Sequence, residues 1–128
     1  MLVHLEAQSK LFIQNGIKDG KYELVSSYTL LYEVSRNPFD MRRDAIEDFI
    51  KQNAKYYIDY DRKDEISAIA LDIMNTGVKE KDAYHVASAI FGNCEYFIST
   101  DKRLLKYKSD KIKLVTPIDF ISETEGIE

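Results

Sequence analysis

Short apolar strands alternate with one-sided helical segments along almost the whole of this 128-residue chain. The alternation predicts an α/β domain with a mostly parallel sheet, because each helix carries the chain back to begin the next strand in the same direction. Strands are expected at 23–26, 56–58, 96–98 and 112–115, with 96–98 as a buried strand. Helices are expected over 2–15, 27–36, 40–50, 61–74, 82–91 and 117–121.

Polar residues at the predicted helix ends indicate where several helices begin or stop. Ser27, Asp40 and Asp61 each precede an apolar helical face, so we expect them to be N-caps whose side-chain oxygens accept hydrogen bonds from the first free N–H groups. Asn15 and Gly16 follow the first apolar helical face and are typical of a helix end.

Length and composition favour one globular domain spanning 1–128. Cys94 is the only cysteine of the chain, so no intramolecular disulfide is expected, and a reducing cytoplasmic location fits this composition. No apolar run approaches the ~18 residues of a membrane-spanning helix, so we expect no membrane partner.

The formal charge of −4 has the wrong sign for holding a polyanion by overall electrostatics. The segment 101–113 has the opposite balance, because its six lysine and arginine residues stand against two aspartates and leave +4. We therefore expect a local basic surface there, to which Arg36, Arg42 and Arg43 add if they fold to the same side. A solvated lysine-rich loop is the alternative interpretation.

Three carboxylates lie where a parallel sheet gathers its ligand residues, just past a strand or on the helix that follows it. Asp101 directly follows the strand at 96–98, Asp82 opens a helix, and Glu33 lies beside apolar residues of an earlier helix. Each also has a purely structural interpretation. Asp101 fits a helix N-cap and Asp82 fits a first-turn acid favoured by the helix dipole. Glu33 fits a salt bridge with Arg36 three residues further on.

Convergence of several carboxylates on one point is costly unless a divalent cation lies between them. Oxygen ligands without a Cys/His cluster favour Mg²⁺ or Mn²⁺, and such ions suit phosphodiester cleavage because they activate water and stabilise the leaving oxygen. His4 and His85 lack metal-ligand spacing, so we expect His85 to pack or to form a hydrogen bond.

Three segments in this order resemble the C-terminal half of a PIN domain: Lys81-Asp82-Ala83-Tyr84-His85-Val86-Ala87-Ser88-Ala89, Tyr96-Phe97-Ile98-Ser99-Thr100-Asp101 and Val115-Thr116-Pro117-Ile118-Asp119-Phe120. The earlier segment from Ser26 to Glu33 resembles the part of that family that carries its second acidic residue. The resemblance covers nearly the whole chain. It implies a three-layer α/β/α fold in which Glu33, Asp82 and Asp101 match three of the family's metal-binding acids.

The resemblance also implies a function and partners. PIN domains are metal-dependent ribonucleases, many of them toxins of bacterial toxin–antitoxin pairs. The expected activity is therefore an Mg²⁺- or Mn²⁺-dependent endoribonuclease that acts on single-stranded or structured RNA, with an antitoxin protein or a second copy of the chain as a partner. The resemblance further places Glu33, Asp82 and Asp101 in the catalytic site.

One family feature has no counterpart here, namely the first apolar strand that ends in an aspartate. We therefore expect an N-terminally incomplete domain in which the strands near Leu24 and Phe97 pair directly or enclose a strand from another chain. An upstream stretch of the same chain, beyond the sequence given, is the other way to fill this place. This departure favours an alternative function, a catalytically impaired PIN-like module that binds RNA or protein. A third interpretation is an unrelated α/β protein whose acids cap helices.

Overall fold

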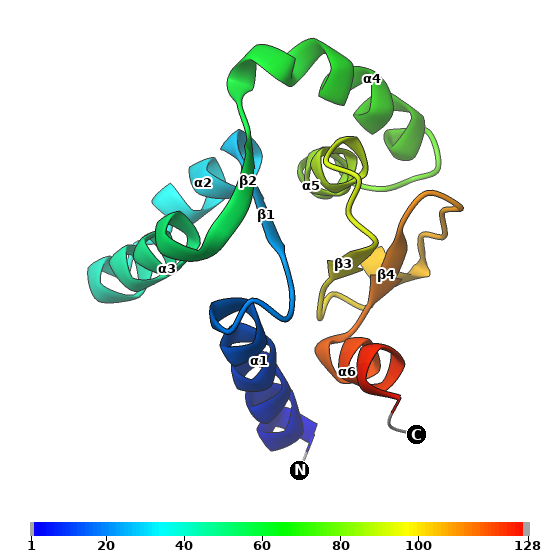
Figure 1. Ribbon diagram of the computed structural model, residues 1–128. Helices are drawn as coiled ribbons and strands as arrows, with labels where there is room; N and C mark the ends of the chain where they lie inside the picture. Colours follow the sequence, from blue (N-terminus) through cyan, green and yellow to red (C-terminus); the bar gives the residue numbers. More distant parts are fainter. Residues whose placement is uncertain (1, 127–128) are drawn as a thin grey trace. The chain divides into compact units, whose positions relative to one another are not determined.

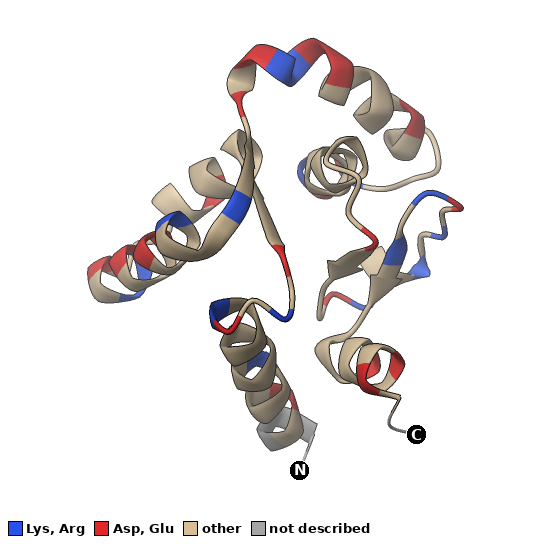
Figure 2. Ribbon diagram, in the orientation of Figure 1, with Lys and Arg blue, Asp and Glu red and all other residues tan. Residues whose placement is uncertain are grey.

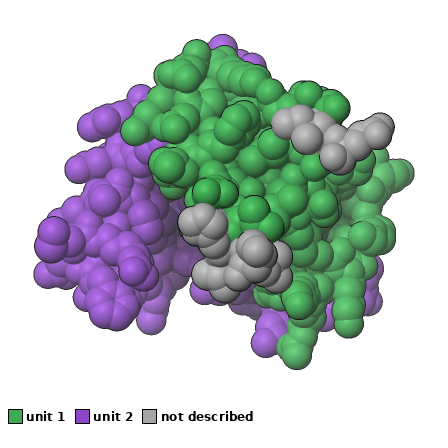
Figure 3. All heavy atoms as spheres, turned by 90° about the horizontal axis from the view of Figure 1, so that it is seen from below, with its two compact units in different colours: residues 1–22, 94–128 green, residues 23–93 purple. Residues whose placement is uncertain are grey.

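The computed structural model describes residues 2–126, and it describes side chains from residue 5 onward. The chain forms two compact units, one from residues 23–93 and the other from the two ends of the chain, up to residue 22 and from residue 94 (Figure 3). Each unit combines helices with a pair of short parallel strands, so the expected α/β class is confirmed. None of the helices in residues 2–126 is long and apolar enough to cross a membrane.

The unit of residues 23–93 is built around one parallel strand pair (Figure 1). β1 (Leu24–Ser27) pairs with β2 (Ala54–Ile58), with a shift in register between Leu24 and Val25. The two strands are connected by α2 (Tyr28–Ser35) and α3 (Asp40–Asn53), which return the chain so that β2 runs parallel to β1. After β2 come the 3₁₀ turn η1 (Tyr60–Arg62), α4 (Lys63–Met74) and α5 (Glu80–Phe91).

The core of this unit lies largely between α4 and α5, which contact each other extensively. On α4, Ile66, Ala70 and Ile73 recur at helical spacing and are buried, as the sequence pattern predicts. The facing side of α5 contributes small or branched side chains that are equally buried: Ala83, Val86 and Ala87. Small residues on α5 allow the two helices to approach closely.

The second unit brings the two ends of the chain together. α1 (Leu2–Lys18) packs against α6 (Pro117–Glu125), and β3 (Tyr96–Ile98) pairs in parallel with β4 (Lys113–Val115). Its core consists of Ile13, Val115 and Phe120. The rings of Tyr22 and Tyr96 meet the Phe120 ring edge-on, with ring centroids 4.9 and 5.1 Å away.

The first helix is confirmed, but its expected end is wrong. α1 runs to Lys18 rather than stopping at Asn15 and Gly16. Gly16 serves close packing instead, because a Cβ atom there would lie only 2.6 Å from a ring carbon of Tyr22. The turn that follows the helix uses Gly20, whose φ of 80° is favourable only for glycine.

The cap at Ser27 is confirmed, since its hydroxyl accepts a hydrogen bond of 3.1 Å from the Leu30 N–H. The predicted cap at Asp40 is wrong. The residue at the N-cap of α3 is Phe39, and Asp40 lies inside the first turn, where it contacts Arg43 at 3.2 Å. An acid in the first turn is favoured by the helix dipole, so it resembles a cap in the sequence without being one.

The predicted cap at Asp61 is also wrong. Asp61 lies within η1, a turn that the sequence pattern did not predict, and Asp59 accepts a hydrogen bond of 2.7 Å from the Tyr60 N–H at its start. The extra 3₁₀ turn moves the polar cap two residues toward the N-terminus, because the chain tightens before α4 begins.

The expected single sheet is present as two separate parallel strand pairs. The ladders found in residues 2–126 join β1 to β2 and β3 to β4, so the expected direct pairing of the strands near Leu24 and Phe97 is not among them. The strand β3 is also less buried than expected, because Ile98 is 36% exposed and Tyr96 and Phe97 are only half-buried.

Candidate functional site

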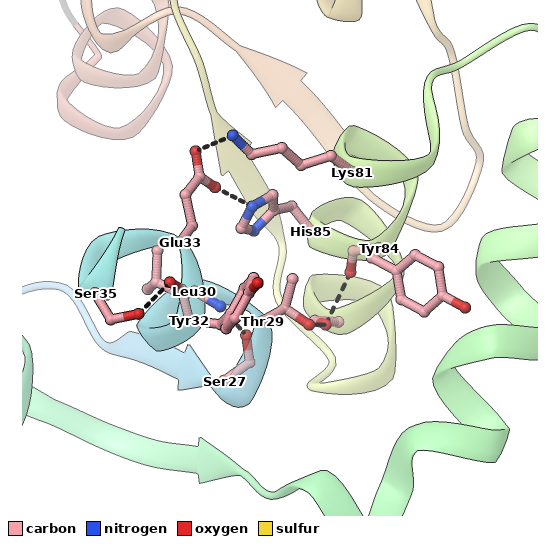
Figure 4. A network of polar contacts seen from close by, with 10 residues as sticks. Ser27, Thr29, Leu30, Tyr32, Glu33, Ser35, Lys81, Tyr84 and His85 are labelled. Carbon is pink, nitrogen blue, oxygen red and sulfur yellow. Dashed lines mark hydrogen bonds and ion pairs between the residues drawn. The ribbon is translucent and has the colours of Figure 1, made fainter. Parts of the chain in front are cut away.

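Glu33 lies on α2 and faces α5 within the unit of residues 23–93 (Figure 4). Its position follows from the local sequence, because Ser27 both ends β1 and caps α2, so that the helix begins directly at the strand's carboxyl end. The Glu33 side chain is 40% exposed. Solvent therefore reaches one side of the Glu33 side chain, and its other side contacts α5.

Two basic groups on α5 meet the Glu33 carboxylate. Lys81 Nζ lies 3.0 Å from one carboxylate oxygen, and His85 Nε2 is in direct ion-pair contact with the other. Lys81 is largely exposed, whereas the Nε2 atom of His85 is buried. The expectation that His85 packs is confirmed, because its side chain is only 13% exposed.

The salt bridge that offers a structural interpretation of Glu33 is present, but its partners are Lys81 and His85 of α5 and not Arg36. Arg36 instead donates a hydrogen bond of 3.0 Å to the Tyr32 hydroxyl, and its guanidinium lies near the Tyr32 ring. Arg36 is the C-cap of α2, and its backbone N–H donates to the carbonyl oxygens of Glu33 and Val34. Glu33 takes its partners from α5.

Opposing effects act on the pKa of Glu33. Partial burial raises this pKa, whereas the hydrogen bond from Lys81 and the positive charges of His85 and Lys81 lower it. The lowering effects are together larger, so the Glu33 carboxyl has a pKa below its usual value of 4.5. Glu33 is therefore ionised at neutral pH, and the basic groups of α5 lie against its negative charge.

Asp82 occupies the first turn of α5, as predicted, and it is half-buried. The adjacent Ala83 is fully buried against α4, which fixes the rotation of the helix at this point. α5 begins at Glu80, two residues before the expected start, so Asp82 lies inside the first turn rather than at the helix end. Glu33 and Asp82 thus belong to neighbouring helices of one unit.

Asp101 lies in the unit formed by the chain ends, just past β3. Its carboxylate accepts hydrogen bonds from the backbone N–H groups of Arg103 at 2.9 Å and Leu104 at 3.3 Å. Asp101 therefore caps the turn that leads into η2 (Leu104–Lys106), whereas the N-cap residue of η2 itself is Arg103. The side chain remains exposed.

Among residues 5–126, whose side chains the structure describes, no three His, Cys, Asp or Glu side chains cluster closely enough to hold a metal ion between them. Glu33 and Asp82 share the unit of residues 23–93, and Asp101 belongs to the other unit. The meeting of these three acids around one cation stays a prediction.

A groove of about 910 Å³ lies beside Glu33 in the same unit. α2, the segment that follows it, α3 and the start of α5 form its walls, and Lys81 and His85 line it together with Glu33. Much of the remaining wall is apolar or aromatic. The groove therefore gives a ligand direct access to the Glu33 carboxylate.

The basic residues of the segment 101–113 are exposed in the unit of the chain ends. Figure 2 marks their positions along the ribbon in blue. Lys113 contacts Glu123, so its charge is neutralised. The other five basic side chains of the segment have no ion pair within the described part of the chain: Lys102, Arg103, Lys106, Lys108 and Lys111. This segment remains positively charged, as its composition predicts.

Sequence reasoning missed that Lys81 and His85 act together on Glu33. A signal for them exists, because residues four apart on a helix share one face, so that the two basic side chains project to the same side of α5. No family model, curated protein or solved structure matches the chain.

Proposed function

We propose that the chain is a PIN-like endoribonuclease of the three-layer α/β/α type that depends on Mg²⁺ or Mn²⁺. Glu33, Asp82 and Asp101 are the proposed metal ligands and catalytic acids. The order of segments that resembles a PIN domain supports this proposal, together with the parallel strands and the helices between them. A role as a cytoplasmic toxin, with an antitoxin protein or a second copy as partner, belongs to the same proposal.

The observation that carries the proposal is the position of Glu33 opposite the first turn of α5, which holds Asp82. The Glu33 carboxylate already balances the ammonium group of Lys81 at 3.0 Å, so this point of the structure attracts positive charge. Carboxylate oxygens are the ligands that Mg²⁺ and Mn²⁺ prefer. The donor chemistry of Glu33 and Asp82 therefore fits the proposed ion.

A bound divalent cation supplies a more acidic water and stabilises the charge on the leaving oxygen during phosphodiester cleavage. The residues of the chain have other tasks in this scheme. Glu33 is ionised at neutral pH, and its contacts with Lys81 and His85 lower its pKa below the ordinary value. The groove beside Glu33 orients the polynucleotide.

Cleavage of a labelled single-stranded RNA with Mn²⁺ tests the proposal. We expect cleavage that EDTA abolishes, and a rate at least about tenfold lower in Asp82→Asn and in Asp101→Asn, because each change removes a charged ligand and keeps the side-chain shape. The matched control is Asp72→Asn, an exposed acid on α4, which should cleave like the parent. Cleavage that persists in EDTA or in Asp82→Asn would contradict the proposal.

A second function is favoured by the contacts of the acids themselves. Both Glu33 oxygens contact basic groups, and Asp101 accepts two backbone hydrogen bonds. Such engagement suits a PIN-like module that binds RNA or protein without cleaving. In the same assay this function predicts RNA bound in EDTA and left intact when Mn²⁺ is added.

A further inference from the structure

Two aromatic–arginine pairs line the groove in the unit of residues 23–93. The Arg36 guanidinium lies 5.7 Å from the centre of the Tyr32 ring, and the Arg42 guanidinium lies 5.6 Å from the centre of the Phe39 ring. Each pair joins a flat apolar surface to a permanent positive charge. The proposed metal chemistry uses neither pair.

The two rings are largely exposed to solvent. Tyr32 is 63% exposed and Phe39 is 65% exposed, so neither contributes much to the core. Both line the groove that also contains Glu33. Exposed aromatic side chains grouped along a groove are typical of a binding surface.

The two guanidinium groups have no acidic partner in the described residues. Arg43, which follows directly in α3, contacts Asp40 at 3.2 Å and Asp44 at 3.5 Å and is thereby neutralised. Arg36 and Arg42 keep donors that can pair with an external anion. Guanidinium groups match phosphate oxygens through paired hydrogen bonds.

We infer that the groove binds single-stranded nucleic acid, with bases stacked on Tyr32 and Phe39 and phosphates held by Arg36 and Arg42. Aromatic stacking accepts any unpaired base because every base has a flat π-face. A duplex buries those faces in its own stack, so the groove selects single strands. The inference rests on the proposed function, which names RNA as the ligand. It adds a binding surface that needs no metal ion.

Fluorescence anisotropy of a labelled single-stranded RNA of about 12 nucleotides, measured in EDTA, tests the stacking role. We expect Tyr32→Leu and Phe39→Leu each to raise the Kd about tenfold, because each removes one stacking platform. A duplex of the same sequence should bind at least about tenfold more weakly than the single strand. A DNA strand of the same sequence shows whether the 2′-hydroxyl contributes.

The salt dependence of the same binding tests the arginines. For single strands, the slope of log K against log salt falls by about 0.7 for each phosphate contact removed. Arg36→Gln and Arg42→Gln should each reduce the slope by about this amount. The leucine variants should leave the slope unchanged, since they remove stacking and no charge.

A matched control exists outside the groove. Lys63 Nζ lies 4.9 Å from the centre of the Tyr60 ring, and Tyr60 is 53% exposed, but neither residue lines the groove. Tyr60→Leu should keep the parent affinity, and Lys63→Gln should keep the parent salt slope. All six altered side chains are exposed, so the melting curves by circular dichroism should match the parent.

Equal affinity in the parent and in both leucine variants would overturn the inference, as would equal losses in the Tyr60 and Lys63 controls. A parent that binds no oligonucleotide would overturn it as well and would leave the groove to a protein partner. Because the assay contains EDTA, retained binding without Mn²⁺-dependent cleavage contradicts only the proposed nuclease. If the parent cleaves RNA and the groove variants bind RNA as tightly as the parent, only the inference about the groove is contradicted.

Discussion

Positive charge from the chain itself lies next to Glu33, at the point where the proposed function places a metal ion. Lys81 meets one carboxylate oxygen at 3.0 Å and His85 meets the other. A divalent cation that binds Glu33 must displace the Lys81 ammonium or share the carboxylate with it. Lys81 therefore contributes to the lowered pKa of Glu33 and competes for this carboxylate as a ligand.

Replacing Lys81 should change the titration of Glu33. The folded-state pKa of Glu33 is below 4.5, so this carboxylate stabilises the fold above pH 4.5, and the contribution is lost as the pH falls through the lowered pKa. Lys81→Gln removes the strongest lowering contact, so we expect the pKa of Glu33 to rise. NMR titration of the carboxyl carbon measures this shift. The control is Lys51→Gln, which removes an ion pair between Lys51 and Glu47 on α3 and should leave the pKa of Glu33 unchanged.

The same replacement should strengthen metal binding. Without the competing ammonium group, Glu33 is free to coordinate, and removing one nearby like charge favours a cation further. We expect the Mn²⁺ affinity of Lys81→Gln, measured by calorimetry, to exceed that of the parent by roughly three- to tenfold. A weaker affinity in this variant would mean that Lys81 orients Glu33 for the ion instead of competing with it.

At the scale of elements, the packing of α4 on α5 holds the candidate site in place. α5 carries Lys81, Asp82 and His85 on a helix whose other side is buried against α4. Ile66 is fully buried in this contact, whereas Leu71 on the same helix is 58% exposed. A shift of α4 therefore moves the groups that meet Glu33.

Truncation of Ile66 should be costly. Ile66→Ala removes buried methyl groups and leaves a cavity, so we expect the free energy of unfolding to fall by about 2–5 kcal/mol. Leu71→Ala, the same kind of change on the exposed side of α4, should cost less than about 1 kcal/mol. Chemical denaturation, monitored by circular dichroism, measures the free energy of unfolding of both variants. Similar losses in both variants would show that the α4–α5 contact is not the stabilising core.

At the scale of the whole molecule, only one of the two units is continuous in sequence. Residues 23–93 contain their own strand pair and the α4–α5 core, whereas the other unit needs α1 from one end and β3, β4 and α6 from the other. The continuous unit has the elements of an independent fold. The other unit is completed only by both ends together.

Expression of the two parts tests this difference. We expect residues 23–93 alone to give a helical circular dichroism spectrum and a cooperative thermal transition, with a lower Tm than the full chain because a domain this short has a small core. Residues 94–128 alone should lack such a transition, since Val115 and Phe120 lose their partner Ile13 on α1. A non-cooperative transition in the 23–93 segment would contradict the prediction.

The sequence allowed most elements to be predicted because burial follows a local period. Ile66, Ala70 and Ile73 recur at helical spacing and are buried as expected. Caps were less predictable, because a polar residue before an apolar face looks the same at the N-cap and inside the first turn, as at Asp40. The partners of Glu33 were unpredictable for another reason. A local pattern offers Arg36, whereas the actual contacts come from α5, far along the chain.

The pairing of α1 with α6 has a consequence for the order of events during synthesis. Translation proceeds at about 5–20 residues per second, so the roughly 100 residues between these helices take about 5–20 s to appear. The continuous unit is finished before α6 exists, and it is free to fold first. Throughout that interval Ile13 lacks the Val115 and Phe120 side chains that cover it in the finished protein. The emerging N-terminal helix is therefore the segment for which we expect protection by a chaperone to matter most.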